Sequence, residues 1–385
     1  MVKNRRCLGQ PLSFPRMRVA IHVGQLRQRV PGGIGRYTEV LCREIPKFGV
    51  DLLTFAAGSV PARDGLSLPG LTDLGQPHDG ARYELWHRLR RPRLPFAADV
   101  VHAPSLAIPP RSDSALVVTI HDVAFLNHPE LFTRRGVSFH KAGLAIAGRE
   151  ADAIITASSF VGRQLINLGF DEKSIHVIPH GVTLSPSADQ SEAERRVEAL
   201  GISAPFILQV GTVEPRKGVE TLIAALQRAR RELPNLTLVL AGPVGWGDVA
   251  GLNAPGVRPL GLVDDSLLEA LYSTASVTTV ASRSEGFGLP ALEALAHGSP
   301  LIASDATSLP EVVGDAGILV PPDYPAAWSK AILDVLTDNT FSDDLRARGP
   351  KRAAMFSWEA SALGHFKAYQ HAVEMHSDRQ RGLLP

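Results

Sequence analysis

The hydrophobic positions of this chain alternate between two patterns, short continuous apolar runs and longer segments with apolar residues at helical spacing. The run at residues 17–24 (MRVAIHVG) ends in glycine, and residues 34–45 then place apolar side chains three and four positions apart. Continuous runs of this length are typical of strands buried on both faces, and the wider spacing is typical of amphipathic helices. The chain therefore opens with a predicted strand, a loop and a helix.

The same alternation continues and is interrupted once. Further strands are predicted at residues 50–57, 98–104, 115–122, 153–158 and 175–181, with helices at 133–150 and 160–168 and a long loop at 58–80. After a polar stretch, strand candidates resume at 206–211, 236–242, 257–263, 277–282, 300–305 and 318–321. Strands that alternate with helices indicate parallel sheets covered on both faces. We expect an α/β protein with two doubly wound domains, residues 17–185 and 205–359, a linker at 186–204 and a ligand cleft between the domains.

Composition narrows the class of protein. A chain of 385 residues with 44% hydrophobic content is long enough for two cores, and its formal net charge of +1 gives no global electrostatic case for nucleic acid. The two cysteines, Cys7 and Cys42, have no metal-ligand spacing and no disulfide framework, so a cytoplasmic protein is expected. Residues 1–16 are basic without the apolar core of a signal peptide, and we interpret them as a leader.

Two carboxylates eight positions apart, Glu285 and Glu293, flank a glycine-rich turn that opens a predicted helix, with Pro290 in its first turn. Gly286 and Gly288 let backbone approach a ligand closely, and the sequence predicts Glu293 in the first helical turn. Free N–H groups at a helix start favour anionic ligands, whereas a carboxylate there can also simply complement the helix dipole. Both interpretations stay open at this point.

A second candidate motif follows the first strand of the second domain. After Gly211 and Thr212, the segment EPRKG places Arg216 and Lys217 immediately before a helix. Adjacent cations at a helix N-terminus suit phosphate oxygens, although a surface Arg-Lys pair is often only solvated. Cations for a diphosphate and carboxylates for sugar hydroxyls together predict a nucleotide sugar as ligand.

With these motifs the chain resembles the retaining glycosyltransferases of family 4, which have the GT-B fold of two Rossmann-like domains that face each other across a cleft. The resemblance covers nearly the whole chain and includes the GGIGRY loop at residues 32–37 and the pair His121-Asp122. It implies that Arg216 and Lys217 bind the donor diphosphate. It also implies that a helix after residue 357, about residues 360–385, returns to the first domain.

The resemblance assigns further roles around the donor. Glu293 would bind the ribose, Glu285 the transferred sugar, and His121 would contact that sugar from the first domain. Backbone near the donor would come from Gly33, Gly211, Thr212, Gly286, Phe287, Gly288 and Leu289. Two positions depart from the family pattern, because Thr212 stands where many relatives carry Arg and His180 stands where Asn is frequent.

The resulting hypothesis is transfer of a hexose from a nucleoside diphosphate sugar to an acceptor hydroxyl with retention at the anomeric carbon. No metal and no cofactor are expected, because preorganised cations and helix N–H groups would stabilise the leaving diphosphate. In the mechanism usual for the family, a leaving-group oxygen accepts the acceptor proton. A nucleotide-sugar 2-epimerase of the same fold and a non-catalytic nucleotide-sugar-binding protein are the alternatives.

The donor and the acceptor are predicted less sharply. The motifs resemble those of mannosyl- and rhamnosyltransferases of polysaccharide assembly, so GDP-mannose is the first choice of donor and a glycan or lipid-linked molecule the acceptor. A basic segment with aromatic residues suits an anionic membrane surface, and a solvated basic face is the alternative. Its cations and aromatics are Arg82, Arg88, Arg90, Arg91 and Arg93 with Tyr83, Trp86 and Phe96. A peripheral contact with the inner face of the plasma membrane is therefore a further hypothesis.

Overall fold

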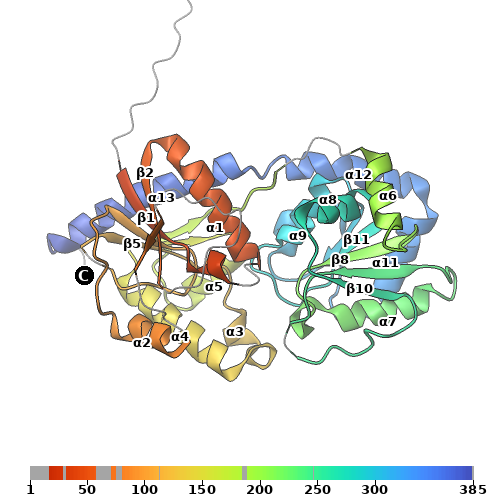
Figure 1. Cartoon of the computed structure of the whole chain (residues 1–385), viewed down its shortest axis with the longest axis horizontal. Helices are drawn as coiled ribbons and strands as arrows, with labels where there is room; N and C mark the ends of the chain where they lie inside the picture. The colour runs from red at the N-terminus through yellow and green to blue at the C-terminus, as the bar shows by residue number, and fades with distance from the viewer. Residues whose placement is uncertain are drawn as a thin grey trace, which may run out of the picture.

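Two parallel sheets, one in each half of the chain, organise the computed structural model (Figure 1). The structure describes residues 17–28, 32–57, 71–74, 80–111, 113–183, 189–245 and 247–383. The predicted leader at 1–16 and Cys7 lie outside this part of the chain. Within it, no helix is both long and apolar enough to cross a membrane.

The first sheet has seven parallel strands in the order β3-β2-β1-β4-β5-β6-β7. Its strands are β1 (Met17–His22), β2 (Val50–Ala56), β3 (Leu71–Asp73), β4 (Val100–Ala103), β5 (Ala115–Thr119), β6 (Ala153–Thr156) and β7 (Ile175–Val177). The prediction of a long loop at 58–80 was wrong at β3, the edge strand of the sheet, which pairs with β2. Three residues are too few to give a readable alternation in the sequence. The rest of that stretch, apart from Leu74 and Gly80, lies outside the described residues.

Helices cover both faces of this first sheet. They are α1 (Gly32–Glu44), α2 (Gly80–Leu89), α3 (Ala124–Asn127), α4 (Arg134–Glu150) and α5 (Ser159–Asn167), with short 3-10 turns at Gly24–Arg27, Ile45–Phe48, Pro129–Leu131 and Glu172–Ser174. Side-chain oxygens fix two of the helix starts. Thr133 accepts from the Gly136 N–H at 3.1 Å, and Ser158 accepts from the Val161 N–H at 3.3 Å.

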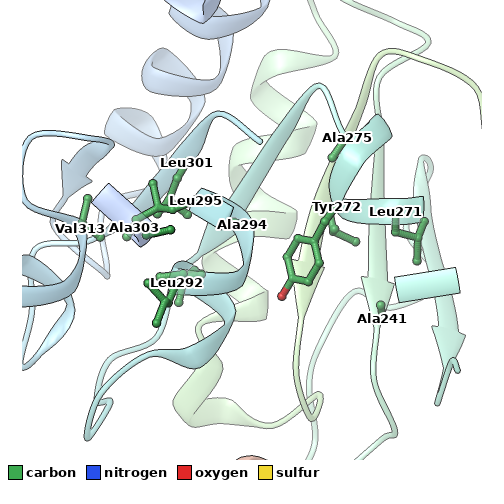
Figure 2. Packing of buried hydrophobic residues seen from close by; sticks show 14 of the residues in the cluster. Ala241, Leu271, Tyr272, Ala275, Leu292, Ala294, Leu295, Leu301, Ala303 and Val313 are labelled. Carbon is green, nitrogen blue, oxygen red and sulfur yellow. The ribbon is translucent and has the colours of Figure 1, made fainter. Parts of the chain in front are cut away.

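The second sheet has six parallel strands in the order β10-β9-β8-β11-β12-β13. Its strands are β8 (Phe206–Val210), β9 (Thr237–Ala241), β10 (Val257–Gly261), β11 (Val277–Val280), β12 (Leu301–Ser304) and β13 (Ile318–Val320). Its helices are α7 (Val219–Ala229), α8 (Asp265–Thr274), α9 (Leu289–Ala296), α10 (Leu309–Val313), α11 (Pro325–Thr337) and α12 (Asn339–Ala353), with a 3-10 turn at Pro215–Lys217. Figure 2 shows one face of its core, where Leu292 and Leu295 of α9 lie near Leu301 and Ala303 of β12.

Two helices connect the halves of the chain. The predicted linker at 186–204 contains α6 (Gln190–Glu198), which packs against α8 of the second domain, so this stretch is not a bare connection. The last helix, α13 (Trp358–Gln380), runs from α12 to the first domain and packs on β5, β6 and α1 (Figure 1). Asp152 anchors its end, because its buried carboxylate accepts from Arg379 and Arg111, each at 2.9 Å. The domain boundaries themselves stay a prediction.

The strand order determines where a ligand can bind. It reverses between β1 and β4 in the first sheet and between β8 and β11 in the second. In open α/β sheets, ligands bind outside the carboxyl ends of strands at such a reversal. The chain segments that follow β1, β5, β8 and β11 contain the GGIGRY segment, His121, the EPRKG segment and Glu285, respectively. The topology therefore brings all four motifs towards one cleft. The prediction of a loop at GGIGRY was wrong, because these residues form the start of α1.

Candidate active site

A cleft of about 590 Å³ lies between the domains and is lined by residues of both. It brings together every residue for which the sequence predicted a site role. From the first domain these are Gly33 and His121, and from the second they are Gly211, Thr212, Arg216, Lys217, Glu285, Gly286, Phe287, Gly288, Leu289 and Glu293. A second hollow of about 820 Å³ lies beside Arg18 and Asp51, at the amino ends of β1 and β2. The interdomain cleft is the candidate site, because parallel sheets bind ligands at the carboxyl ends of their strands.

The EPRKG segment forms a tight turn immediately before α7, as the sequence predicted. Pro215–Lys217 is one turn of 3-10 helix, and Gly218 follows it with φ 66°, in the left-handed region. A β-carbon at Gly218 would collide with the carbonyl oxygen of Ala281. Glycine is therefore required here by conformation and by space, and the turn aims Arg216 and Lys217 at the loop after β11.

Both cations of this turn contact Glu285. Lys217 Nζ lies 2.5 Å from Glu285 Oε1, and Arg216 Nη1 lies 3.6 Å from Glu285 Oε2. The hydroxyl of Ser282 donates to Glu285 Oε1 at 2.7 Å. Burial pushes the pKa of Glu285 upward, but Lys217 and Arg216 outweigh it and hold this pKa below its usual value. Glu285 therefore stays ionised and can act only as a hydrogen-bond acceptor at neutral pH.

Arg216 is held by further contacts. Its Nη2 lies 2.9 Å from the carboxylate of Glu214, and its Nη1 donates to the backbone carbonyl of Ser284 at 2.9 Å. Burial alone would lower the pKa of Arg216, but Glu285, Asp122 and Glu214 raise it above its usual value. The guanidinium is thus a fixed positive charge at the cleft.

The loop that carries Glu285 is fixed by two hydroxyls. Thr307 Oγ1 accepts from the Glu285 N–H at 3.0 Å, and Ser308 Oγ donates to the carbonyl groups of Glu285 and Phe287 at 2.9 and 3.0 Å. Gly288 then caps α9, which begins at Leu289. The prediction that Glu293 lies in the first turn was wrong, since it is the fifth residue of α9. Pro290 is the second helical residue and lies in the first turn, as the sequence predicted.

Glu293 faces the cleft from the second turn of α9, and both of its oxygens are engaged. Tyr272 of α8 donates to Oε2 at 2.9 Å, and Arg36 of α1 donates to Oε1 from the other domain. Burial raises the pKa of Glu293, and Arg36 and Tyr272 counteract that rise only in part. A buried carboxylate held in one orientation can accept two hydrogen bonds from a vicinal diol such as ribose.

The sequence did not identify Arg36 or Tyr272 as site residues. Arg36 belongs to the GGIGRY segment, but its partner lies 257 positions away and no local pattern reveals it. Tyr272 lies on the apolar stripe of α8 and resembled a core residue. A buried tyrosine usually has a partner for its hydroxyl, which is the one signal that was available.

The first domain approaches the Glu285 loop through backbone contacts. A β-carbon at Gly286 would collide with the carbonyl oxygen of His121, and Ser158 Oγ donates to the Gly286 carbonyl at 2.7 Å. His121 Nε2 lies 2.8 Å from the carbonyl oxygen of Pro104. Since a carbonyl only accepts, Nε2 carries the proton, and burial lowers the pKa of His121. His121 is therefore a neutral imidazole whose Nδ1 is an acceptor.

His180, one of the two departures from the family pattern, also lines the cleft. Its ring lies between those of Tyr37, Phe287 and Trp358, with centroid distances of 4.8, 5.1 and 6.0 Å. Burial lowers its pKa well below the usual value. The residue is a neutral, ring-packed part of the cleft wall, and it adds no charge there.

The basic segment at residues 82–96 directs some of its described side chains inward and leaves others, among them Arg88, Arg91 and Arg93, exposed. Trp86 is buried, Arg90 makes a bidentate pair with Glu150 at 2.8 to 3.2 Å, and Arg88 pairs with Glu84 at 2.7 Å. Leu85 and Leu89 are exposed at 57% and 61%. The side chains of Arg82 and Tyr83 lie outside the described part. A membrane contact through this segment stays a prediction.

Comparisons with known proteins agree with this architecture. The model described as Glycosyltransferase Family 4 matches residues 31–186, and the model described as Glycosyl transferases group 1 matches residues 204–338. O-antigen chain mannosyltransferase B of Escherichia coli is 33% identical over 286 residues, which span 70% of this chain and 74% of that protein. The chain belongs to glycosyltransferase family 4. It is a hexosyltransferase.

Two solved structures support the GT-B fold of this glycosyltransferase. Anabaena Alr3699/HepE in complex with UDP-glucose matches with a TM-score of 0.71 at 18% identity, covering 94% of this chain and 100% of that one. WaaG, a glycosyltransferase involved in lipopolysaccharide biosynthesis, matches with a TM-score of 0.68 at 17% identity, covering 91% and 98%. At these identities the likeness concerns the fold alone.

Proposed function

We propose that this glycosyltransferase moves a mannose from GDP-mannose to an acceptor hydroxyl with retention of the anomeric configuration. One observation carries the proposal: Lys217 and Arg216 meet Glu285 at the carboxyl ends of β8 and β11, inside the interdomain cleft. Charges for a diphosphate and an acceptor for a sugar hydroxyl thus lie within a few ångströms of each other. A nucleoside diphosphate sugar presents phosphate oxygens and sugar hydroxyls side by side, so it could engage both groups.

The chemistry follows from where charge develops. In glycosyl transfer the diphosphate leaving group gains negative charge while the sugar becomes oxocarbenium-like. Lys217 and Arg216 would stabilise the leaving diphosphate, and because both are already held in place, little reorganisation would be needed during the reaction. When the diphosphate binds the Lys217 ammonium, the Glu285 carboxylate would lose its contact with Lys217 and accept a hydrogen bond from the sugar. The neutral His121 would accept a hydrogen bond from a sugar hydroxyl through Nδ1.

Retention fits the protonation states of these groups. Glu285 has a lowered pKa and is paired with two cations, which makes it a weak base. The proton of the acceptor hydroxyl would therefore pass to an oxygen of the leaving diphosphate on the same face of the sugar. Glu293 would hold the ribose, with Tyr272 fixing its orientation. No step in this sequence calls on a cofactor.

The choice of donor and acceptor rests on similarity. The E. coli relative is named an O-antigen chain mannosyltransferase, which supports mannose as the sugar and a polysaccharide as the acceptor. A lipid-linked glycan would bring the chain to the inner face of the plasma membrane. Leu85 and Leu89, exposed on α2 beside Arg88, are where such a contact would form.

A donor screen followed by a transfer assay tests the proposal. Thermal shifts with GDP-, UDP-, ADP- and dTDP-sugars would identify the donor, and we expect the largest stabilisation with GDP-mannose. The selected donor is then incubated with an acceptor lipid extract. Release of free nucleoside diphosphate that depends on the acceptor is the expected result. A C2-epimerised donor, or release that is independent of acceptor, would overturn it.

A further inference from the structure

The ion pair between Arg36 and Glu293 joins the two domains inside the cleft. Arg36 is the fifth residue of α1, and its Nη1 donates to Glu293 Oε1, while its Nη2 lies 3.6 Å from Asp265 Oδ1. Tyr272 donates to the other oxygen of Glu293. Two carboxylates of the second domain therefore hold the guanidinium of the first.

This arrangement places Arg36 where a ribose would bind. Tyr272 and Arg36 each occupy one acceptor position, on different oxygens of Glu293, and a vicinal diol that binds both oxygens competes with them for space and for these positions. The Tyr272 side chain is fully buried, whereas the Arg36 side chain is 41% exposed on a long flexible stem. Arg36 is therefore the group that a ribose displaces.

The charge balance of the cleft indicates where the displaced guanidinium goes. Among the described lining residues there are six carboxylates and three cations, Arg36, Arg216 and Lys217. His121 and His180 are neutral because burial lowers their pKa values. Thr212 supplies no charge at the turn after β8, and Arg216 and Lys217 already neutralise carboxylates. A diphosphate entering this acidic cleft would therefore attract a third cation.

We propose that Arg36 is a donor-binding residue supplied by the first domain. When the ribose binds Glu293, the Arg36 guanidinium leaves that carboxylate and binds the donor diphosphate. The inference rests on the proposed function, because it assumes a nucleoside diphosphate in the cleft. This exchange would let the protein discriminate between nucleosides and nucleoside diphosphates. A nucleoside must break the Arg36–Glu293 pair without compensation, whereas a nucleoside diphosphate offers Arg36 a new partner.

The test compares paired ligands on the full chain. Dissociation constants are measured by calorimetry, or by NMR titration where binding is weak, for GDP, UDP and ADP and for guanosine, uridine and adenosine. The proteins are the wild type, Arg36→Gln and the control Arg18→Gln, which removes a first-domain arginine that is 53% exposed and lies outside the cleft. The readout is the affinity of each diphosphate relative to its nucleoside.

We expect this ratio to fall at least about tenfold in Arg36→Gln, since diphosphate binding loses a charge-assisted bond while nucleoside binding is unchanged or improved. Arg18→Gln should keep the wild-type ratio. Equal changes for diphosphate and nucleoside in Arg36→Gln, or none, would show Arg36 to be only an interdomain contact. If Arg36→Gln proves misfolded by circular dichroism, Arg36→Met carries the same comparison. Failure of every diphosphate to bind the wild type would instead refute the proposed function.

Discussion

Lys217 and Glu285 neutralise one another, with 2.5 Å between the ammonium nitrogen and a carboxylate oxygen, although they lie on different loops of the second domain. Their side chains are only 12% and 10% exposed, so little water screens the pair. A group that engages both must replace this contact. A sugar diphosphate can do so, because its phosphate oxygens accept from the ammonium and its sugar hydroxyls donate to the carboxylate.

Tyr272→Phe tests whether Glu293 must be held in a fixed orientation. The variant removes one hydrogen bond, at 2.9 Å, from the carboxylate that would bind ribose. We expect KM for the donor to rise about three- to tenfold with little change in kcat, because a bond of this kind contributes about 1 kcal/mol. Steady-state kinetics with varied donor provide the measurement. Tyr324→Phe, at a tyrosine that is 60% exposed, is the matched control, and a kcat effect with unchanged KM would argue against this role.

Glu311→Ala tests a contact that holds the domains together outside the cleft. The Glu311 carboxylate of α10 accepts from the backbone N–H groups of Ser159 and Phe160 at 2.8 and 2.6 Å, at the start of α5 in the first domain. An anionic acceptor at a helix N-terminus stabilises by about 1 to 2 kcal/mol. We expect a larger radius of gyration by solution scattering and a lower melting temperature. Glu130→Ala, at a side chain that is 66% exposed, should change neither. An unaltered radius in Glu311→Ala would mean that other contacts suffice.

The buried, neutral state of His365 predicts that the free energy of unfolding decreases in mild acid. This residue is fully buried, lies 2.7 Å from both the Tyr37 hydroxyl and the Ser361 carbonyl, and burial lowers its pKa from 6.5 to about 4. Between these two values the unfolded chain binds a proton that the folded chain does not. The contribution of His365 to the free energy of unfolding should therefore have its full value above pH 6.5. It should decrease by about 3 kcal/mol as the pH falls towards 4.

The measurement for His365 is urea unfolding at a series of pH values. In His365→Gln we expect a lower free energy of unfolding at every pH. The decrease in this free energy between pH 6.5 and 4 should, however, be about 3 kcal/mol smaller than in the wild type. His128→Gln, at a side chain that is 47% exposed, is the control and should keep the wild-type slope. Parallel pH profiles for His365→Gln and the wild type would contradict the buried neutral state.

Local patterns in the sequence identified most strands, the two-sheet class and the residues that line the cleft. They succeeded where one short segment contains the signal, as in Pro215–Lys217 or the start of α9. The structure also showed elements that such patterns missed. The strand β3 has three residues, and α6 is polar apart from Ala193 and Val197, which it buries against the second domain.

The contacts between groups across the cleft could not be predicted from the sequence for a different reason. Arg36 and Glu293, or Ser158 and the Gly286 carbonyl, come together because two sheets present their carboxyl ends to one another. Nothing near either residue in the chain specifies its partner. The protonation states of Glu285 and His121 were hidden for the same reason, since burial and long-range neighbours set them.

Turnover of Lys217→Ala tests the central claim most directly. The nucleoside diphosphate released from GDP-mannose in the presence of acceptor lipid extract is measured for the wild type, Lys217→Ala and Lys330→Ala, the last removing an exposed lysine. If Lys217 stabilises the leaving diphosphate, kcat should fall roughly 30- to 1000-fold in Lys217→Ala alone. This loss corresponds to an activation barrier that is higher by about 2 to 4 kcal/mol. Acceptor-dependent release at the wild-type rate in a folded Lys217→Ala would contradict the account.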